Sequence, residues 1–142
     1  MKIVWDFDNL FAFGDRLSDF HNYETAIMTA TQEIAKVLHH ALITRTPVLT
    51  GNLRKCWSNG DNLQFIVEKT EGGYTVTLEN NAQNEHGYKY GYAVNYGHRS
   101  PNGGWVVGRF FIENSIIETE EKLNKVVQKE LQKWLEWCVN GK

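Results

Sequence analysis

The sequence predicts an α+β fold: a small, largely antiparallel β-sheet packed with two long amphipathic helices, one before the strands and one C-terminal. Two observations support this fold. Apolar residues recur every three or four positions over residues 18–43 and again over 109–139, which indicates helices with one buried face. Between them, short apolar segments and one alternating apolar and polar stretch are typical of half-buried strands.

The first helix is predicted over residues 18–43. Ser18 or Asp19 could supply its N-cap, because their side-chain oxygens accept hydrogen bonds from the free N–H groups of a first turn. Pro47 should end the helix, since proline disfavours helical geometry in the residue before it. Residues 46–53 are therefore expected to form a loop.

Residues 1–17 are predicted to form an N-terminal arm or strand, and residues 18–142 a single α+β domain. The run Ile3-Val4-Trp5 has the composition of a short strand. Several aromatic side chains follow it, and exposed aromatic side chains favour contact with a partner. Two interpretations stay open: an arm that docks on a neighbouring ring, or an extension of the domain's own core.

Strand character is found at four places: residues 53–57, 63–69, 74–78 and 92–96. Glu71-Gly72-Gly73 is a short connection typical of a β-hairpin, so the sheet is expected to be antiparallel there. The polar, glycine-containing stretches 80–91 and 98–104 are expected to be exposed loops. Both long helices are expected to cover one side of the sheet and leave its other face for partners.

The C-terminal helix, predicted over residues 109–139, has its charges ordered by sign. Acidic side chains lie in its first half and lysines follow, which complements the helix dipole. The order also allows pairs four residues apart, such as Glu118 with Lys122. These charges are expected to form a solvated face.

Composition and charge limit the classes of function. Lys and Arg number 15 against 17 Asp and Glu, and the net charge of −2 provides no bulk attraction to nucleic acid. No apolar run approaches the ~20 residues of a membrane-spanning helix, and Asp6 comes too early for the apolar core of a signal peptide. Cys56 and Cys138 form no disulfide framework, so we expect buried apolar thiols in a reducing cytoplasm.

One pattern favours an enzyme. The first apolar run ends in Asp6-Phe7-Asp8, which resembles the first motif of haloacid-dehalogenase-type phosphatases. In that interpretation Asp6 is the nucleophile and Asp8 the general acid, both beside a magnesium ion. Asp15 and Asp19 mimic the acidic motif of that family, but they follow Asp8 within eleven residues. The βαβ units that separate the family's motifs are absent, so this is the least favoured hypothesis.

Other catalytic and metal-binding patterns do not occur in the sequence. The five histidines include no His-Glu-x-x-His arrangement, and the neighbours His39 and His40 point to different sides of a helix. There is no Gly-x-Ser-x-Gly elbow, no Walker-type Gly-Lys-Ser and no dinucleotide fingerprint. We therefore expect no metal, no cofactor and no enzymatic activity.

Aromatic and cationic residues gather between residues 88 and 105. Lys89, Arg99 and Trp105 could contact DNA, because aromatic rings beside cations stack on bases. The alternative is packing of loops against each other or against a neighbouring subunit, since aromatic and arginine side chains are also enriched at protein interfaces. We favour the second interpretation.

Two segments stand out together. The first is Thr46-Pro47-Val48-Leu49-Thr50-Gly51-Asn52-Leu53-Arg54, and the second is Tyr92-Ala93-Val94-Asn95-Tyr96-Gly97-His98 followed by Gly108-Arg109-Phe110-Phe111. Their order between two helices resembles the tail-completion, or neck, proteins of long-tailed bacteriophages over roughly residues 18–137. That family has a Thr-Pro-Val-x-Thr-Gly-x-Leu-Arg segment, a Tyr-Ala-x-x-Val-Glu-Tyr-Gly segment and a Gly-Arg-x-Phe entry to its last helix. The sequence departs from the family at Asn95, where an acidic residue often stands.

The resemblance implies a structural virion protein. It would form a closed ring of six copies at the head-proximal end of the tail, between the tail tube on one side and the neck or connector on the other. DNA would pass such a ring without sequence-specific binding. The protein would be found in the virion and, during assembly, in the host cytoplasm.

The contacts of such a ring are expected on two loops, residues 46–54 and 98–109, with Arg54 and Arg109 as polar anchors. The predicted interface residues are Thr46, Pro47, Thr50, Gly51, Leu53, Arg54, Tyr96, Gly97, His98, Arg99, Gly108 and Arg109. A DNA-contacting assembly factor is the alternative from another class.

Overall fold

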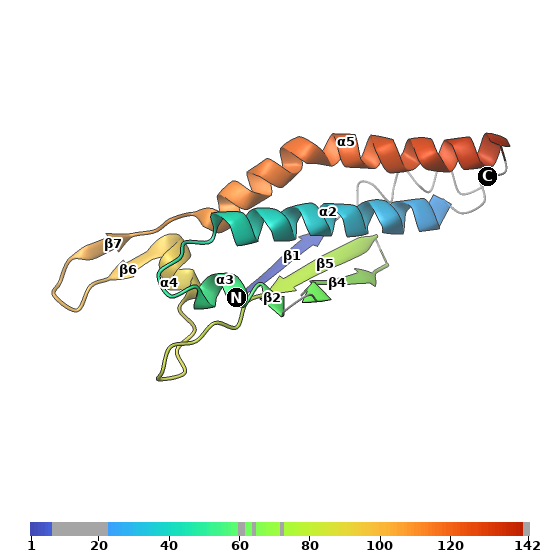
Figure 1. Ribbon diagram of the computed structural model, residues 1–142. Coiled ribbons are helices and arrows are strands. Elements are labelled where there is room, and N and C mark those ends of the chain that lie inside the picture. The colour runs from blue at the N-terminus through green and yellow to red at the C-terminus, as the bar shows by residue number, and fades with distance from the viewer. Residues whose placement is uncertain (7–22, 60–61, 64, 72, 141–142) are drawn as a thin grey trace.

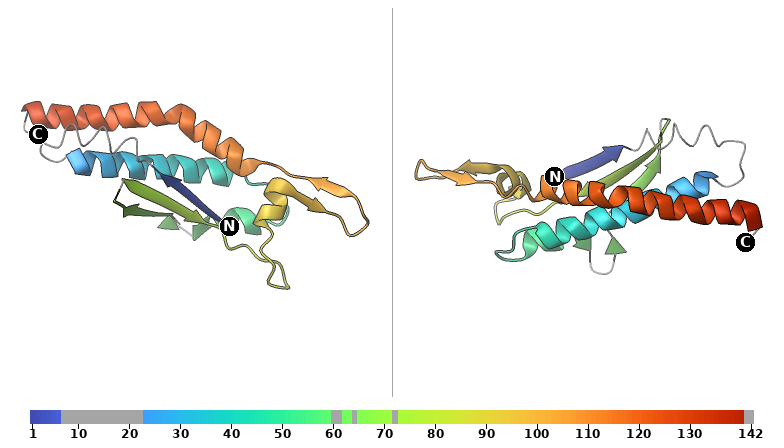
Figure 2. Two further views of the ribbon diagram at one scale, coloured as in Figure 1. Left: turned by 180° about the vertical axis from the view of Figure 1, so that it is seen from behind. Right: turned by 90° about the horizontal axis from the view of Figure 1, so that it is seen from above.

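The computed structural model describes residues 1–6, 23–59, 62–63, 65–71 and 73–140, which form an α+β fold as predicted. The long helices α2 (Tyr23–Arg45) and α5 (Phe111–Asn140) run side by side. A small sheet lies against α2 on the side away from α5 (Figure 1). The hairpin of β6 (Gly97–Arg99) and β7 (Trp105–Val107) extends from the end opposite the C-terminus (Figures 1 and 2).

The main sheet has three antiparallel strands in the order β1-β5-β4, and their bounds are β1 Lys2–Asp6, β5 Tyr74–Glu79 and β4 Phe65–Lys69. The predicted β4–β5 hairpin is confirmed, with backbone hydrogen bonds in both directions between Thr70 and Gly73. A second, two-stranded sheet pairs β2 (Ser58–Asn59) with β3 (Asn62–Leu63). The predicted run Ile3-Val4-Trp5 is part of β1, whereas residues 7–17 of the predicted arm lie outside the described residues.

The core lies between α2 and the main sheet and continues to the first turn of α5. Its largest buried apolar side chains are Ile34, Leu38, Leu42, Leu53, Trp57, Val76, Leu78 and Phe111. Side chains at alternate positions of β5 are buried, as the alternating pattern predicted. Burial of this apolar surface is the main force that holds α2 on the sheet.

Both predicted long helices are confirmed, with small shifts at their ends. α2 ends at Arg45, while its predicted start and the candidate caps Ser18 and Asp19 lie outside the described residues. α5 begins at Phe111 rather than Arg109, because Phe110 has a φ of 49°, which no α-helical residue adopts. The predicted pair of Glu118 and Lys122 is present at 2.7 Å.

The packing of α5 differs from the prediction. It lies along α2 and not beside α2 on the sheet, so the three layers are sheet, α2 and α5 (Figure 1). Its buried face carries Ser115 and Thr119, whose hydroxyls donate to the carbonyl oxygens of Phe111 and Ser115 at 2.6 and 2.8 Å. The hydroxyl groups of these small side chains are satisfied within α5, so they can be buried where α5 approaches α2 closely.

Two predicted strands are short helices. Residues 53–57 contain the end of α3 (Asn52–Lys55), because Gly51 turns the chain with a φ of 83° and a helical turn buries Leu53 and Trp57 together. Residues 92–96 lie in α4 (Gly91–Tyr96), which buries Asn95 completely. A strand would place Leu53 and Trp57 on one face as well, so the spacing alone could not separate the two structures.

The predicted loop 98–104 is also corrected, since its ends belong to the β6–β7 hairpin. Only the segment between these strands is a turn, closed by hydrogen bonds between Ser100 and Gly103 and between Ser100 and Gly104. Residues 80–90 form the expected connection between β5 and α4, with one isolated bridge between Gln83 and Lys89. Most of it is exposed as predicted, but Asn80 and Ala82 are buried, because the Asn80 side chain donates to the carbonyl oxygen of Leu53 and accepts from the N–H of Ala82.

Candidate interaction surface

A groove of about 600 Å³ opens where the β6–β7 hairpin leaves the body of the molecule. One wall is the loop between α2 and α3, and the other is formed by α4 and the hairpin. The two segments singled out in the sequence therefore border the same groove. Four of its apolar side chains are well exposed: Val48 by 55%, Leu49 by 98%, Val106 by 45% and Val107 by 73%. A contiguous exposed apolar surface of this kind is typical of protein–protein contact sites.

Further aromatic side chains are exposed on the same end of the molecule. Tyr92 and Tyr96 stack at 6.1 Å between ring centroids, and Phe110 meets Tyr96 edge to face at 6.4 Å. Trp105 on β7 is 65% exposed. A second, smaller pocket of about 350 Å³ lies near the other end, between α2 and the last turns of α5. The groove and its aromatic surroundings are the larger and more apolar surface.

Two glycines determine where the hairpin leaves the body. Gly97 has a φ of 89°, and a Cβ atom there would lie 2.4 Å from the carbonyl oxygen of Val106. A Cβ atom on Gly108 would lie 2.3 Å from the carbonyl oxygen of Asn95. Backbones approach this closely only where both positions lack a side chain. The two glycines of the sequence motifs are thus explained by the crossing of the hairpin's two ends.

Backbone hydrogen bonds hold this crossing together. The N–H of Arg109 donates to the carbonyl of Val94 at 3.0 Å, and the N–H of Phe110 donates to that of Asn95 at 2.9 Å. The side-chain oxygen of Asn95 accepts a further hydrogen bond from the N–H of Ile112 at 3.0 Å. Ile112 is in the first turn of α5, where backbone N–H groups have no partner within the helix. Asn95 therefore attaches the start of α5 to α4.

The amide nitrogen of Asn95 donates to both carboxylate oxygens of Glu113, at 3.2 and 2.8 Å. Burial raises the pKa of Glu113, but hydrogen bonds from Asn95, its own backbone and Tyr96 outweigh burial and lower this pKa. The bond to Glu113, followed by burial, raises the pKa of Tyr96. The junction thus contains a carboxylate that is held in its charged form.

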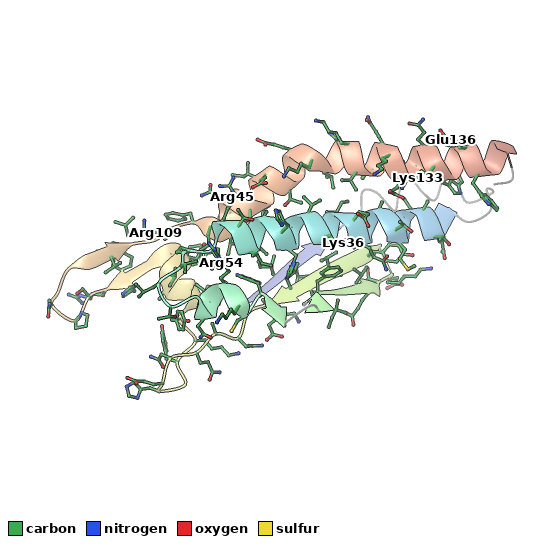
Figure 3. The ribbon with its side chains drawn as sticks, in the orientation of Figure 1. Lys36, Arg45, Arg54, Arg109, Lys133 and Glu136 are labelled. Carbon is green, nitrogen blue, oxygen red and sulfur yellow. The ribbon has the colours of Figure 1, made fainter. Side chains whose placement is uncertain are left out.

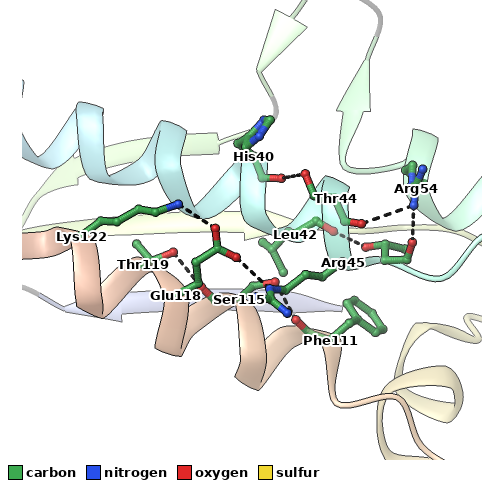
Figure 4. Close-up of polar contacts among 11 residues, drawn as sticks. His40, Leu42, Thr44, Arg45, Arg54, Phe111, Ser115, Glu118, Thr119 and Lys122 are labelled. Carbon is green, nitrogen blue, oxygen red and sulfur yellow. Dashed lines mark hydrogen bonds and ion pairs between the residues drawn. The ribbon is translucent and has the colours of Figure 1, made fainter.

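Hydrogen bonds at both ends hold the loop between α2 and α3 in place. The hydroxyl of the buried Thr46 accepts a hydrogen bond from the indole N–H of Trp57 at 2.9 Å. Arg54 donates to the carbonyl oxygens of Thr46 at 3.0 Å and Thr44 at 3.4 Å, which are free because α2 ends there (Figure 4). A ring nitrogen of His39 contacts the carbonyl of Trp57. The loop that carries Val48 and Leu49 is therefore rigid at both ends.

Residues 11–97 match the model of a protein family described as "Bacteriophage HK97-gp10, putative tail-component". The matched residues make up more than half of the chain and include α2, α3 and α4. The chain belongs to this HK97-gp10-like family. No curated protein and no solved structure matches it. This member of the HK97-gp10-like family is accordingly a structural component of a bacteriophage tail.

The predicted interface residues of this HK97-gp10-like protein fall into three groups by their position in the structure. Thr46 and Leu53 are buried, and Arg54 is half-buried and bound to its own chain. Gly97 and Gly108 form the hairpin crossing. The remaining residues lie in the groove lining or on the exposed surface beside it: Pro47, Thr50, Gly51, Tyr96, His98, Arg99 and Arg109. Arg109 is exposed and forms no ion pair with the parts of the chain that the structure describes (Figure 3).

Sequence reasoning missed the apolar side chains of the groove. Val48 and Leu49 were included in the first motif without a role, and Val106 and Val107 were not singled out. The signal was present, because large apolar residues in predicted loops have no core face to fill. It also missed the role of Asn95, since no local pattern relates a residue of α4 to the N–H of Ile112.

The structure adds no support for the candidate DNA-contacting residues or for the phosphatase-like motif. Lys89 donates to Asn81 at 2.7 Å, whereas Arg99 and Trp105 are paired in the hairpin register and exposed. Asp6 ends a strand that is antiparallel to its neighbour, and Asp8 lies outside the described residues. In the described ranges, histidine, cysteine and carboxylate side chains form no cluster that could hold a metal ion. Of the helices described, none is long and apolar enough to cross a membrane.

Proposed function

We propose that the chain is a ring-forming tail-completion, or neck, subunit that joins the head-proximal end of the tail tube to the neck or head. The observation that carries this proposal is the apolar groove beside the projecting hairpin. The exposed side chains of Val48, Leu49 and Val107 lie on a loop and a hairpin that are held in place at their ends, and they do not pack in the core of the described chain. Exposed side chains fixed in this way are suited to binding other proteins, in keeping with a tail component.

The proposed ring requires one particular form of contact between subunits. When one surface of a subunit binds a different surface of the next, the contact repeats and closes into a ring if the rotation between subunits suits it. A ring, for which we propose six copies, presents many identical sites at once to the tail tube and to the neck or connector. Its DNA contacts would be unspecific, as the net charge of −2 gives no general attraction to phosphate.

Electron microscopy of particles tests the proposal. The protein is labelled at its C-terminus in producing cells, and particles made without it are compared. Label at the head-proximal end of the tail, together with unjoined or abnormal tails in its absence, is the expected result. Label elsewhere on the tail, or normal particles without the protein, would contradict the neck role. The membership of the tail family would be unaffected by that outcome.

A further inference from the structure

The groove combines an apolar floor with a positively charged border. Its lining contains Arg109 and no acidic side chain among the described residues. Two more cations are exposed close to lining residues: Arg99 follows His98 on β6, and Lys55 on α3 reaches to 4.0 Å from the position of a Cβ atom on Gly51. Glu85, which follows the groove residue Asn84, lies 3.5 Å from His86, and no Asp or Glu occurs in the sequence between it and Glu113. A partner segment that combines an apolar side chain with carboxylates would complement such a surface.

The chain itself carries a segment with this chemistry on α5. Ile117 is 53% exposed, although its neighbours Ser115 and Thr119 are buried against α2. Glu120 and Glu121 follow at the spacing that places them on the same outward face as Ile117, and both are exposed. Neither forms an ion pair with any residue that the structure describes. Glu118, in contrast, is bound by Arg45 and Lys122 (Figure 4).

We propose that this face of α5, defined by Ile117, Glu120 and Glu121, docks into the groove of the next copy in the ring. Ile117 contacts the apolar floor at Leu49, and the two carboxylates face Arg99 and Arg109. The inference rests on the proposed ring and names the partner of the groove. The two surfaces differ and lie on different elements, so one contact can repeat from copy to copy, as a ring requires.

Charge reversal in producing cells tests the pairing. The variant Arg99→Glu/Arg109→Glu and the variant Glu120→Lys/Glu121→Lys each replace attraction by repulsion. Each is expected to lower the number of joined particles roughly tenfold or more. The chain that carries all four substitutions regains attraction with its charges exchanged, and is expected to recover most joined particles. Co-expression of the two double variants should also recover them, because alternating copies then present opposite charges at every contact.

A matched control carries Glu68→Lys/Glu71→Lys, the same charge change at two exposed positions away from α5. This variant is expected to give normal numbers of joined particles. Loss of particles in either double variant without recovery in the combined chain would overturn the pairing. So would unaffected assembly in both, or a loss confined to the groove variant, which would indicate an acidic segment of another protein. The location of the labelled wild-type protein is independent of these outcomes and decides the neck role separately.

Discussion

The side-chain oxygen of Asn95 accepts a hydrogen bond from the backbone N–H of Ile112 at 3.0 Å, while its amide nitrogen donates to Glu113. One buried side chain thus attaches two neighbouring residues of α5 to α4. Because the hairpin leaves the body between these two helices, Asn95 also fixes the base of the hairpin.

Asn95→Asp tests this role, because it places a second carboxylate beside Glu113. Two neighbouring carboxylates repel each other when both are charged. We expect a loss of about 2 kcal/mol of unfolding free energy at pH 7. The loss should shrink as the pH falls, because the folded pair then retains a proton. Urea unfolding measured from pH 7 to pH 4 checks this. Asn95→Asp/Glu113→Gln, which exchanges the amide and the carboxylate, should recover most of the lost stability.

Gly108→Ala is expected to destabilise the protein by about 2 kcal/mol or more, since its Cβ atom would lie 2.3 Å from the Asn95 carbonyl oxygen. Gly97→Ala should be at least as harmful, because its φ of 89° adds backbone strain. Gly104 is the matched control, since a Cβ atom there meets nothing within 4 Å and its φ is not in the left-handed region. Thermal unfolding of the three variants checks the order. Equal effects at positions 104 and 108 would refute the close crossing.

Arg54→Ala and Arg109→Ala should separate folding from assembly. Arg54 bonds the carbonyl oxygens at the end of α2, so its loss should cost about 1–2 kcal/mol of unfolding free energy. Arg109 is exposed, so its loss should change stability by no more than about 0.5 kcal/mol but reduce joined particles. Denaturant unfolding and particle counts, made on the same two variants, check this. A stable Arg54→Ala protein that fails only in assembly would contradict the assignment.

Glu118→Gln is expected to make stability less dependent on pH. Hydrogen bonds from Lys122 and then Arg45 lower the pKa of Glu118 below the ordinary value of 4.5. A carboxyl group with a lowered folded-state pKa stabilises the fold above its unfolded pKa and loses this effect as the pH falls through the folded pKa. The variant should therefore be less stable than wild type at pH 7, by up to about 1 kcal/mol at low salt. The difference should shrink as the pH falls below 4.5 and vanish once the pH is below the folded-state pKa of Glu118, as measured by unfolding at a series of pH values.

Leu49→Ser tests the apolar groove without disturbing the core. Leu49 is 98% exposed, so unfolding free energy should change by no more than about 0.5 kcal/mol. Joined particles should nevertheless decrease. Ile66→Ser is the control, because Ile66 is also exposed, by 58%, but lies on the outer face of β4. A decrease of the same size in both variants would remove the groove from the assembly surface.

The long elements of the fold could be predicted because they contain many repeats of their own pattern. α2 and α5 span several turns, and each turn adds an apolar residue to the same face. α3 and α4 could not be predicted in this way, since four and six residues contain too few turns to show a helical period. Leu53 and Trp57 are compatible with a strand or a helix by spacing.

The location of the candidate surface could be predicted better than its chemistry. Motif residues such as Pro47 and Arg109 do line the groove. Others, such as Thr46 and Gly108, are required for the positions of the loop and hairpin and are not themselves exposed contacts. A short motif marks a place where the backbone is constrained, and it does not distinguish side chains that bind a partner from side chains that hold the loop.

The crossing at Gly97 and Gly108 has an evolutionary consequence. The position of the hairpin is set by backbone contacts at its two ends, together with a contact between His98 and the carbonyl oxygen of Ala93. The exposed side chains of its turn, such as Pro101 and Asn102, can therefore be exchanged while the hairpin keeps its direction. A phage lineage that acquires a new tail protein could adapt this subunit by changes at the tip of the hairpin, with the helices and the sheet left untouched.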